Sequence, residues 1–433
     1  MQKSAADRKG DAVSTAHSEN HAEVGSPRPP AKIYLTAFVL GVAVLTSFAF
    51  RLNAPRSLFY DEVLYVDAAK AFLAGAPDTN PEIPPLGKYL IAAGIRLFGD
   101  NPYGWRAVSL CFGAGTVVAV FLWLYLLLHD YGLALAGALL AILNNFLYVM
   151  SRVAMMDIFL VGFLLWGLVA FTTVLDLDEL PGTIRRILMA FAGTMFGLAS
   201  ACKWNGIDTL GIVGFIAVAL LWLTRKPQAS ELLRYGQNLR QVGVFFGALS
   251  LVVVPVLAYS LTFWPMCRDT HYPFNLRNVV AMNVVMWKLH RADPGNVFIA
   301  SKWYSWIFQA APQRALSYLV GNWVIMWSGV VALVFCLRRI RHLPEAFVVL
   351  LYAGNLLQWA ITPQKHLYYY YYFPCAVFIG AAIPIALYRL PRRIFGVPLS
   401  LLCVGAAAIA FLFCLQRMAY LDSPYDCVFG CWP

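Results

Sequence analysis

Residues 33–50 read IYLTAFVLGVAVLTSFAF, a run without a single charge, and Phe59-Tyr60-Asp61-Glu62 follows shortly after it. A helix needs roughly 20 apolar residues to cross about 30 Å of hydrocarbon, so this run predicts a first membrane span. The acidic pair then lies just behind that span. Because charge beside a bilayer is costly, charge gathered at one membrane face is a functional-site hypothesis.

The composition of the whole chain supports a membrane protein. Of its 433 residues, 60% are hydrophobic and only 13% are charged, which is far too apolar for a soluble domain of this length. Helices and closed barrels are the only structures that span a bilayer, and the apolar runs here are continuous rather than alternating. The fold class predicted is therefore an all-α integral membrane protein.

The apolar runs predict about eleven transmembrane helices. The two around 187–223 are interrupted by Lys203-Trp204-Asn205-Gly206. The predicted spans are 33–50, 107–128, 132–150, 156–175, 187–202, 207–223, 242–263, 317–337, 345–361, 367–388 and 396–415.

The net charge of +11 is explained by topology rather than by nucleic acid. Lys and Arg concentrate in alternate short loops, as cytoplasmic loops do. This places the N-terminus in the cytoplasm and the C-terminus outside. Residues 1–31 are predicted to be a disordered cytoplasmic tail without a cleavable signal peptide, 32–420 the membrane domain, and 421–433 a short outer tail. Whether Cys427 and Cys431 pair in that tail is left open.

Two outer loops are long, at about 51–106 and 264–316. In the first, Asp61–Leu73 and Pro85–Phe98 have helical patterns but are too short and too polar to span. They are predicted to be amphipathic helices along the membrane surface. The second loop is rich in Trp, Tyr, His and Arg, which suit sugar rings and lipid head groups equally well.

Charged and aromatic side chains at the outer face are the candidate site residues. Asp61 and Glu62 could accept a proton from an attacking hydroxyl, or simply favour a helix N-terminus. Cations near them could hold a phosphate, snorkel to head groups or form structural ion pairs. Candidates for binding a substrate or donor are Glu82, Lys88, Arg152, Asp157, Lys203, His290, Trp303, Tyr304, Lys365 and His366.

These pieces occur in the order seen in protein O-mannosyltransferases, GT-C glycosyltransferases that use polyprenyl-phosphate sugars. The sequence resembles a bacterial member of that family, over nearly the whole chain after the tail. The ordered set of motifs carries the resemblance, since each is weak alone. It comprises Asp61-Glu62, Pro84-Pro85-Leu86-Gly87-Lys88, Ser151-Arg152 with Met156-Asp157, Lys203-Trp204, Met286-Trp287 with His290, Ser301-Lys302-Trp303-Tyr304-Ser305-Trp306, and Tyr372-Phe373-Pro374.

The resemblance implies that Asp61 is the catalytic base and that Glu62, Arg152 and Asp157 shape the site. It also implies that Lys365 or His366 lies near the donor phosphate. The chain departs from the family at two histidines. Ile83 stands where the family has His before Pro-Pro, and 296–299 lack the second one. Glu82 before Pro-Pro is also similar to the aminoarabinose transferases that modify lipid A.

The function predicted is therefore an inverting glycosyltransferase that moves a sugar, mannose by the resemblance, from a polyprenyl-phosphate donor to a hydroxyl of a protein Ser or Thr at the outer face. The same chemistry on a lipid or envelope glycan, a transporter or flippase, and a non-catalytic scaffold are the alternatives. No cofactor is required, although Asp61, Glu62, Glu82 and Asp157 could gather around a divalent cation. Membrane lipid is the remaining expected partner, in the inner membrane of a bacterium.

Overall fold

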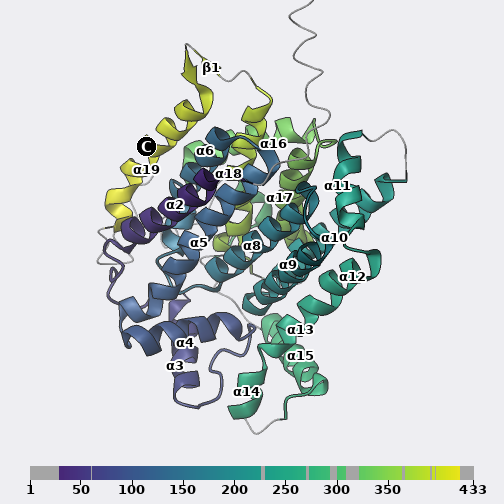
Figure 1. Cartoon of the computed structure of the whole chain (residues 1–433). Helices are drawn as coiled ribbons and strands as arrows, with labels where there is room; N and C mark the ends of the chain where they lie inside the picture. The colour runs from purple at the N-terminus through teal and green to yellow at the C-terminus, as the bar shows by residue number, and fades with distance from the viewer. Residues whose placement is uncertain are drawn as a thin grey trace, which may run out of the picture.

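The structure is a computed structural model that describes residues 29–59, 61–225, 230–269, 273–292, 300–308, 321–362, 366–390, 393–394 and 396–419. Almost all of its regular structure is helical (Figure 1). The first half comprises α2 (Ala31–Ala49), α3 (Glu62–Leu73), α4 (Leu86–Phe98), α5 (Pro102–Leu128), α6 (Tyr131–Ile142), α7 (Asn145–Met150), α8 (Met156–Asp176), α9 (Gly182–Cys202) and α10 (Gly206–Leu223).

The second half contains longer connections and several broken helices. It comprises α11 (Ser230–Arg240), α12 (Val244–Ala248), π-helical η1 (Leu249–Val253), α13 (Val254–Leu261), α14 (Trp264–Asp269), α15 (Leu276–Ala292), 3₁₀-helical η2 (Trp303–Phe308), α16 (Trp323–Leu337), α17 (Leu343–Ile361), 3₁₀-helical η4 (Tyr369–Tyr372), α18 (Phe373–Tyr388) and α19 (Leu399–Ala419). A small antiparallel hairpin, β1 (Arg393–Ile394) with β2 (Val397–Pro398), precedes α19.

The predicted helical membrane fold is confirmed. Within the described residues, eight helices are long and apolar enough to cross a bilayer: α2, α5, α8, α9, α10, the continuous α12–η1–α13 helix, α17 and η4–α18. Three shorter apolar helices, α6, α16 and the first part of α19, coincide with the remaining predicted spans. The count of eleven spans therefore stays a prediction.

One predicted span is divided. The segment 132–150 was expected to be a single helix, and the structure breaks it between α6 and α7. Asn144 is the reason, because its side-chain oxygen accepts the Phe146 amide at 3.1 Å and so caps α7. Its amide nitrogen donates to the Ala376 carbonyl at 3.2 Å, which ties the break to α18. A capping side chain inside an apolar run ends one helix and starts another.

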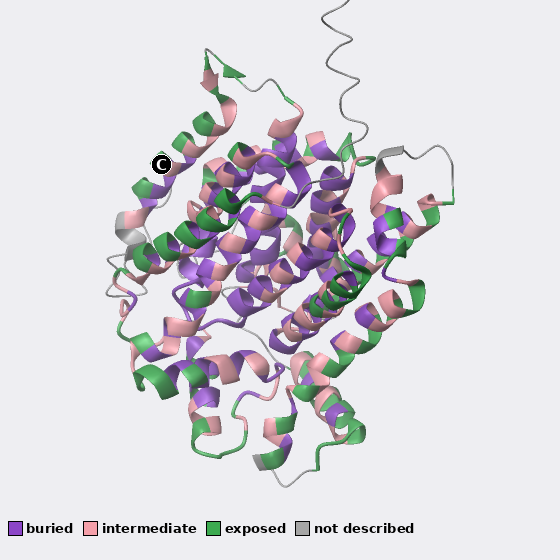
Figure 2. Ribbon diagram, viewed as in Figure 1, coloured by how far each residue is buried: buried purple, intermediate pink, exposed green. Residues whose placement is uncertain are grey.

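The core lies along the middle of the bundle, where α8 packs between α5 and α9 and α18 packs against α16 and α17 (Figure 2). Gly193 and Gly197 lie one turn apart on α9. A Cβ at either position would collide with the backbone of η1 and α13, at the Ser250 and Pro255 carbonyls. Small residues at this spacing let helices approach closely in a membrane.

The two short helices predicted in the first outer loop are present as α3 and α4. They pack against each other, and α4 packs on α5. In Figure 1 they lie at the lower end of the bundle, with α14 and α15. This end of the molecule carries most of the candidate site residues.

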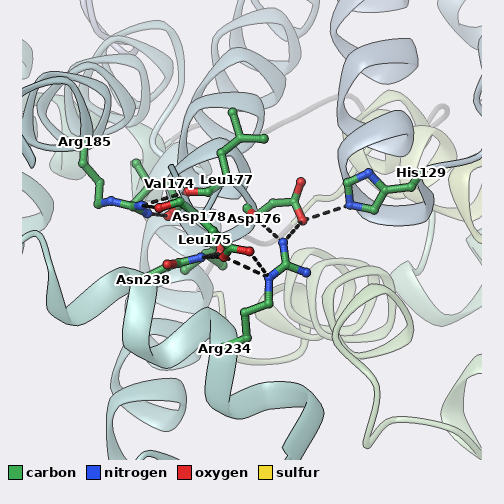
Figure 3. A network of polar contacts seen from close by, with 9 residues as sticks. All are labelled: His129, Val174, Leu175, Asp176, Leu177, Asp178, Arg185, Arg234 and Asn238. Atoms are coloured by element: carbon green, nitrogen blue, oxygen red, sulfur yellow. Dashed lines mark hydrogen bonds and ion pairs between the residues drawn. The ribbon is translucent and has the colours of Figure 1, made fainter. Parts of the chain in front are cut away.

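At the opposite end, polar side chains close the C-terminus of α8 (Figure 3). Arg234 on α11 donates through Nε to both Asp178 carboxylate oxygens, at 2.9 and 3.0 Å. Asn238 donates to the Leu175 carbonyl at 2.9 Å, and Arg185 to the Leu177 carbonyl at 2.8 Å. Arg234 and Arg185 are cations at the negative end of the helix dipole, and Arg234 with Asn238 anchors α11 at this end of the bundle.

Candidate active site

Asp61 is half-buried at the start of α3 and is held by two tyrosines from different parts of the chain. The Tyr370 hydroxyl donates to Asp61 Oδ2 at 2.8 Å, and the Tyr65 hydroxyl reaches the same oxygen at 3.4 Å. Tyr65 is one helical turn further along α3, whereas Tyr370 comes from η4, more than 300 residues away. Burial raises the pKa of Asp61, while the Tyr370 hydrogen bond and the Lys203 charge oppose that rise.

Lys203 lies where α9 ends, beside this carboxylate. Its ammonium group is 2.8 Å from Asp157 Oδ1, in the first turn of α8. It also lies over two tyrosine rings, 5.2 Å from the centroid of Tyr370 and 4.1 Å from that of Tyr371. Asp157 Oδ2 is buried and has no hydrogen-bond partner in the described part of the chain. The site therefore holds a cation close to two carboxylates and two aromatic faces.

A pocket of about 290 Å³ opens next to Lys203. Segments far apart in the sequence form it: the first outer loop, the α9–α10 turn, α15, the end of α17 and η4. Its lining combines acids, cations and aromatic rings. The residues are Glu82, Ile83, Pro84, Lys203, Trp204, Asn205, Ile207, Asp208, Trp287, His290, Arg291, Gln358, Trp359, Thr362 and Tyr371. Such a mixture suits a polar ring with hydroxyl groups beside an anion.

Three of the predicted binding residues, Glu82, Lys203 and His290, share this pocket. The His290 ring lies 5.9 Å from that of Trp204, which in turn donates to the Tyr259 hydroxyl at 3.0 Å. Tyr371 stacks on Trp359 with their ring centroids 4.7 Å apart. The aromatic walls are thus fixed by contacts between elements.

Glu62, next to the proposed base in sequence, points elsewhere. Its carboxylate is fully buried against Arg106 of α5, with nitrogen–oxygen distances of 2.8 and 2.7 Å. The amides of Phe59 and Ala154 donate to the same carboxylate at 2.8 and 2.7 Å. Each oxygen of Glu62 accepts two hydrogen bonds, so this side chain joins the first loop to α5 and the α7–α8 turn.

Lys88 is also fully buried, and its ammonium group is ion-paired and hydrogen-bonded within the first loop. It pairs with Asp78 and donates to the carbonyls of Asn80 at 2.7 Å and Ile83 at 3.1 Å. Burial lowers the pKa of Lys88, and Asp78 opposes that shift. A carboxylate therefore meets the cation in the first turn of α4, where the helix dipole disfavours it.

Arg152 ties the α7–α8 turn to the end of the first span. It donates to the Tyr148 hydroxyl and to the carbonyls of Phe50 at 2.9 Å and Arg51 at 2.6 Å. Asp157, five residues further along, is ion-paired with Lys203 instead.

The aromatic stretch of the second outer loop lies beside the tyrosine run. The Ser301 amide donates to the Leu367 carbonyl at 2.7 Å, and Trp306 is buried against Trp359 and Tyr372. Trp303 and Tyr304 begin η2 and lie outside the pocket lining. His366 adjoins Leu367 and is also absent from that lining, and Lys365 lies outside the described residues.

Four residues of the site were not predicted from the sequence, because no local pattern indicates their contacts. Arg106 and Asp78 complete the ion pairs of Glu62 and Lys88, Tyr370 holds Asp61, and Asp208 lines the pocket. A charge at the border of an apolar run, such as Arg106, was the one available signal. Among the described residues, no group of three or more His, Cys, Asp or Glu side chains could hold a metal ion.

Two solved structures have a similar fold: the S. cerevisiae protein O-mannosyltransferase Pmt1–Pmt2 complex bound to the sugar donor, and ArnT from Cupriavidus metallidurans bound to undecaprenyl phosphate. The first has a TM-score of 0.75 at 13% identity and covers 93% of this chain and 94% of that one. The second has a TM-score of 0.59 at 16% identity, covering 92% and 74%.

The sequence comparisons find relatives with a common description. Residues 98–270 match the family model described as dolichyl-phosphate-mannose-protein mannosyltransferase. A polyprenol-phosphate-mannose–protein mannosyltransferase of Corynebacterium glutamicum is 24% identical over 90% of this chain and 89% of its own length. One of the same description from Mycobacterium tuberculosis is 28% identical over 42% of this chain and 38% of its own length. The predicted resemblance is confirmed: the chain is similar to protein O-mannosyltransferases in sequence and in fold over nearly its whole length.

Proposed function

We propose that the protein transfers a mannosyl group from a polyprenyl phosphate to a Ser or Thr hydroxyl of a protein, with inversion at the anomeric carbon. The single observation that carries this is the placement of Asp61. A carboxylate with a raised pKa lies beside a cation that borders a pocket of about 290 Å³. A general base and an electrostatic clamp on the leaving group are what such a displacement requires.

The step is a single displacement. Asp61 removes the proton of the acceptor hydroxyl as that oxygen forms a bond to the anomeric carbon. The bond from this carbon to the phosphate oxygen breaks, and polyprenyl phosphate leaves with the electron pair and an added negative charge. Lys203 lies near the base and faces the pocket, so its charge is placed to stabilise that developing anion.

The pocket walls would hold the sugar. Trp204, Trp287 and Tyr371 offer aromatic ring faces to the sugar. The carboxylates of Glu82 and Asp208 can accept hydrogen bonds from sugar hydroxyl groups. Three further side chains, Glu62, Lys88 and Arg152, stabilise this arrangement, because their polar groups bind the loops that carry Asp61 and Glu82.

The orientation proposed puts this end of the bundle outside a bacterial inner membrane and the N-terminus in the cytoplasm. The opposite end carries Arg185, Arg186 and Arg234, as the cytoplasmic side should. A polyprenyl-linked sugar and an exported protein would meet at the outer face.

Transfer from labelled polyprenyl-phosphate-mannose by purified protein in liposomes tests this function. We expect label in a Ser- and Thr-containing acceptor peptide, and its release by an exomannosidase. If the label appeared only in a lipid or an envelope glycan, the acceptor would differ from the one proposed, while the reaction would be the same. Absence of transfer to every acceptor, with donor crossing the bilayer instead, would contradict the function and favour a flippase.

A further inference from the structure

The two tyrosines next to Asp61 both donate hydrogen bonds to the same carboxylate oxygen, and neither donates to the other oxygen. Both Tyr370 and Tyr65 reach Oδ2, at 2.8 and 3.4 Å. Within the described ranges, no hydrogen bond to Oδ1 is present. A carboxylate held in this way has one oxygen fixed by the protein, and its other oxygen can accept a proton from the substrate. The distances also rank the two donors, since hydrogen bonds weaken as they approach 3.5 Å.

The surrounding rings fix Tyr370 in this position. Its side chain is buried in η4, which contains four of the five consecutive tyrosines at 368–372. The Tyr368 ring stacks on that of Tyr370 with an interplanar angle of 5°, and the Tyr371 ring meets it edge-on at 4.7 Å. In a 3₁₀ turn, residues three apart share a face, so Tyr369 and Tyr372 point together into the core instead. Tyr370 is thus the member of the run that faces the base.

The charges around Asp61 come from each element packed against it. Lys203 at the end of α9 favours the ionised carboxylate, and Asp157 of α8 opposes it. Tyr370 of η4 and Tyr65 of α3 favour the ionised form by donating hydrogen bonds. Of the two tyrosines, Tyr370 has the larger effect on the pKa of Asp61.

We propose that Tyr370 is the positioning residue of the general base: its hydroxyl holds Asp61 through Oδ2 and leaves Oδ1 to take the proton of the acceptor. This inference rests on the proposed function, because it assigns Tyr370 a role in the same step. Tyr370 acts through Asp61 and contacts neither the sugar nor the phosphate in this role. Tyr65 is its weaker counterpart.

The pH profile of transfer tests the inference with Tyr370→Phe. Loss of a hydrogen bond to a charged group should move the acidic limb of kcat/KM upward by about one pH unit. The direction follows because the lost bond favours the ionised form, so the pKa of Asp61 rises further. At pH values above the shifted limb, activity should return to within a few-fold of wild type. Tyr65→Phe is the matched control and should shift the limb by much less.

Two outcomes would overturn the inference. One is a Tyr370→Phe profile lowered equally at every pH with no shift, as a purely structural role predicts. The other is a shift in Tyr65→Phe as large as that in Tyr370→Phe. Failure of the proposed function itself would be visible separately, because then the wild type would transfer no sugar or Asp61→Asn would match it.

Discussion

Asp61→Asn is expected to lower the rate of mannosyl transfer about 10²–10⁴-fold, the usual contribution of a general base. The amide preserves the shape of the side chain, and its oxygen can still accept a hydrogen bond from the Tyr370 hydroxyl. It cannot take a proton from the acceptor. The measurement is initial rate in liposomes at equal amounts of folded protein.

Asp67→Asn provides the matched control, because Asp67 is exposed on the same helix, α3. It should transfer at the wild-type rate. An Asp61→Asn protein that retained more than a tenth of wild-type activity would show that another group is the base.

The second large effect concerns stability. Arg106→Met leaves the Glu62 carboxylate buried without its partner, and breaking a buried pair in this way costs about 3–5 kcal/mol. Arg106 also donates to the carbonyls of Leu52 at 3.1 Å and Pro55 at 2.8 Å. We therefore expect a much lower yield of folded protein, and a lower temperature at which the purified protein loses its monodisperse peak.

Arg96→Met, at an exposed position on α4, should behave as wild type. The double variant Arg106→Met with Glu62→Met should recover part of the loss, since no charge is then stranded. If Arg106→Met were as heat-stable as wild type but inactive, Glu62 and Arg106 would have to act in the chemistry rather than in folding.

The pair Asp61-Glu62 illustrates what the sequence could and could not establish. Two adjacent acids behind a membrane span predicted a site at this place, and the structure puts a pocket beside Lys203, whose charge acts on Asp61. Neighbours on a helix point about 100° apart, so one faces Tyr370 and the other Arg106. Those partners lie 309 and 44 residues away, and no local pattern encodes them.

Lys88 and Lys203 show the same limit. Both are cations next to predicted helix ends, and both were expected to be near the donor. Lys88 is ion-paired with Asp78, ten residues before it in an irregular loop, whereas Lys203 lines the pocket. The helices themselves were predictable because a long apolar run has few alternatives in a bilayer. Asn144 altered one of them because capping depends on a single polar side chain.

The configuration of the new glycosidic bond tests the central claim most directly. Nuclear magnetic resonance of a mannosylated peptide, made by the purified protein from a donor of known anomeric form, gives this result in one experiment. A single displacement driven by Asp61 predicts the anomeric configuration opposite to that of the donor. Retention of the donor configuration would require a second displacement and would contradict the account.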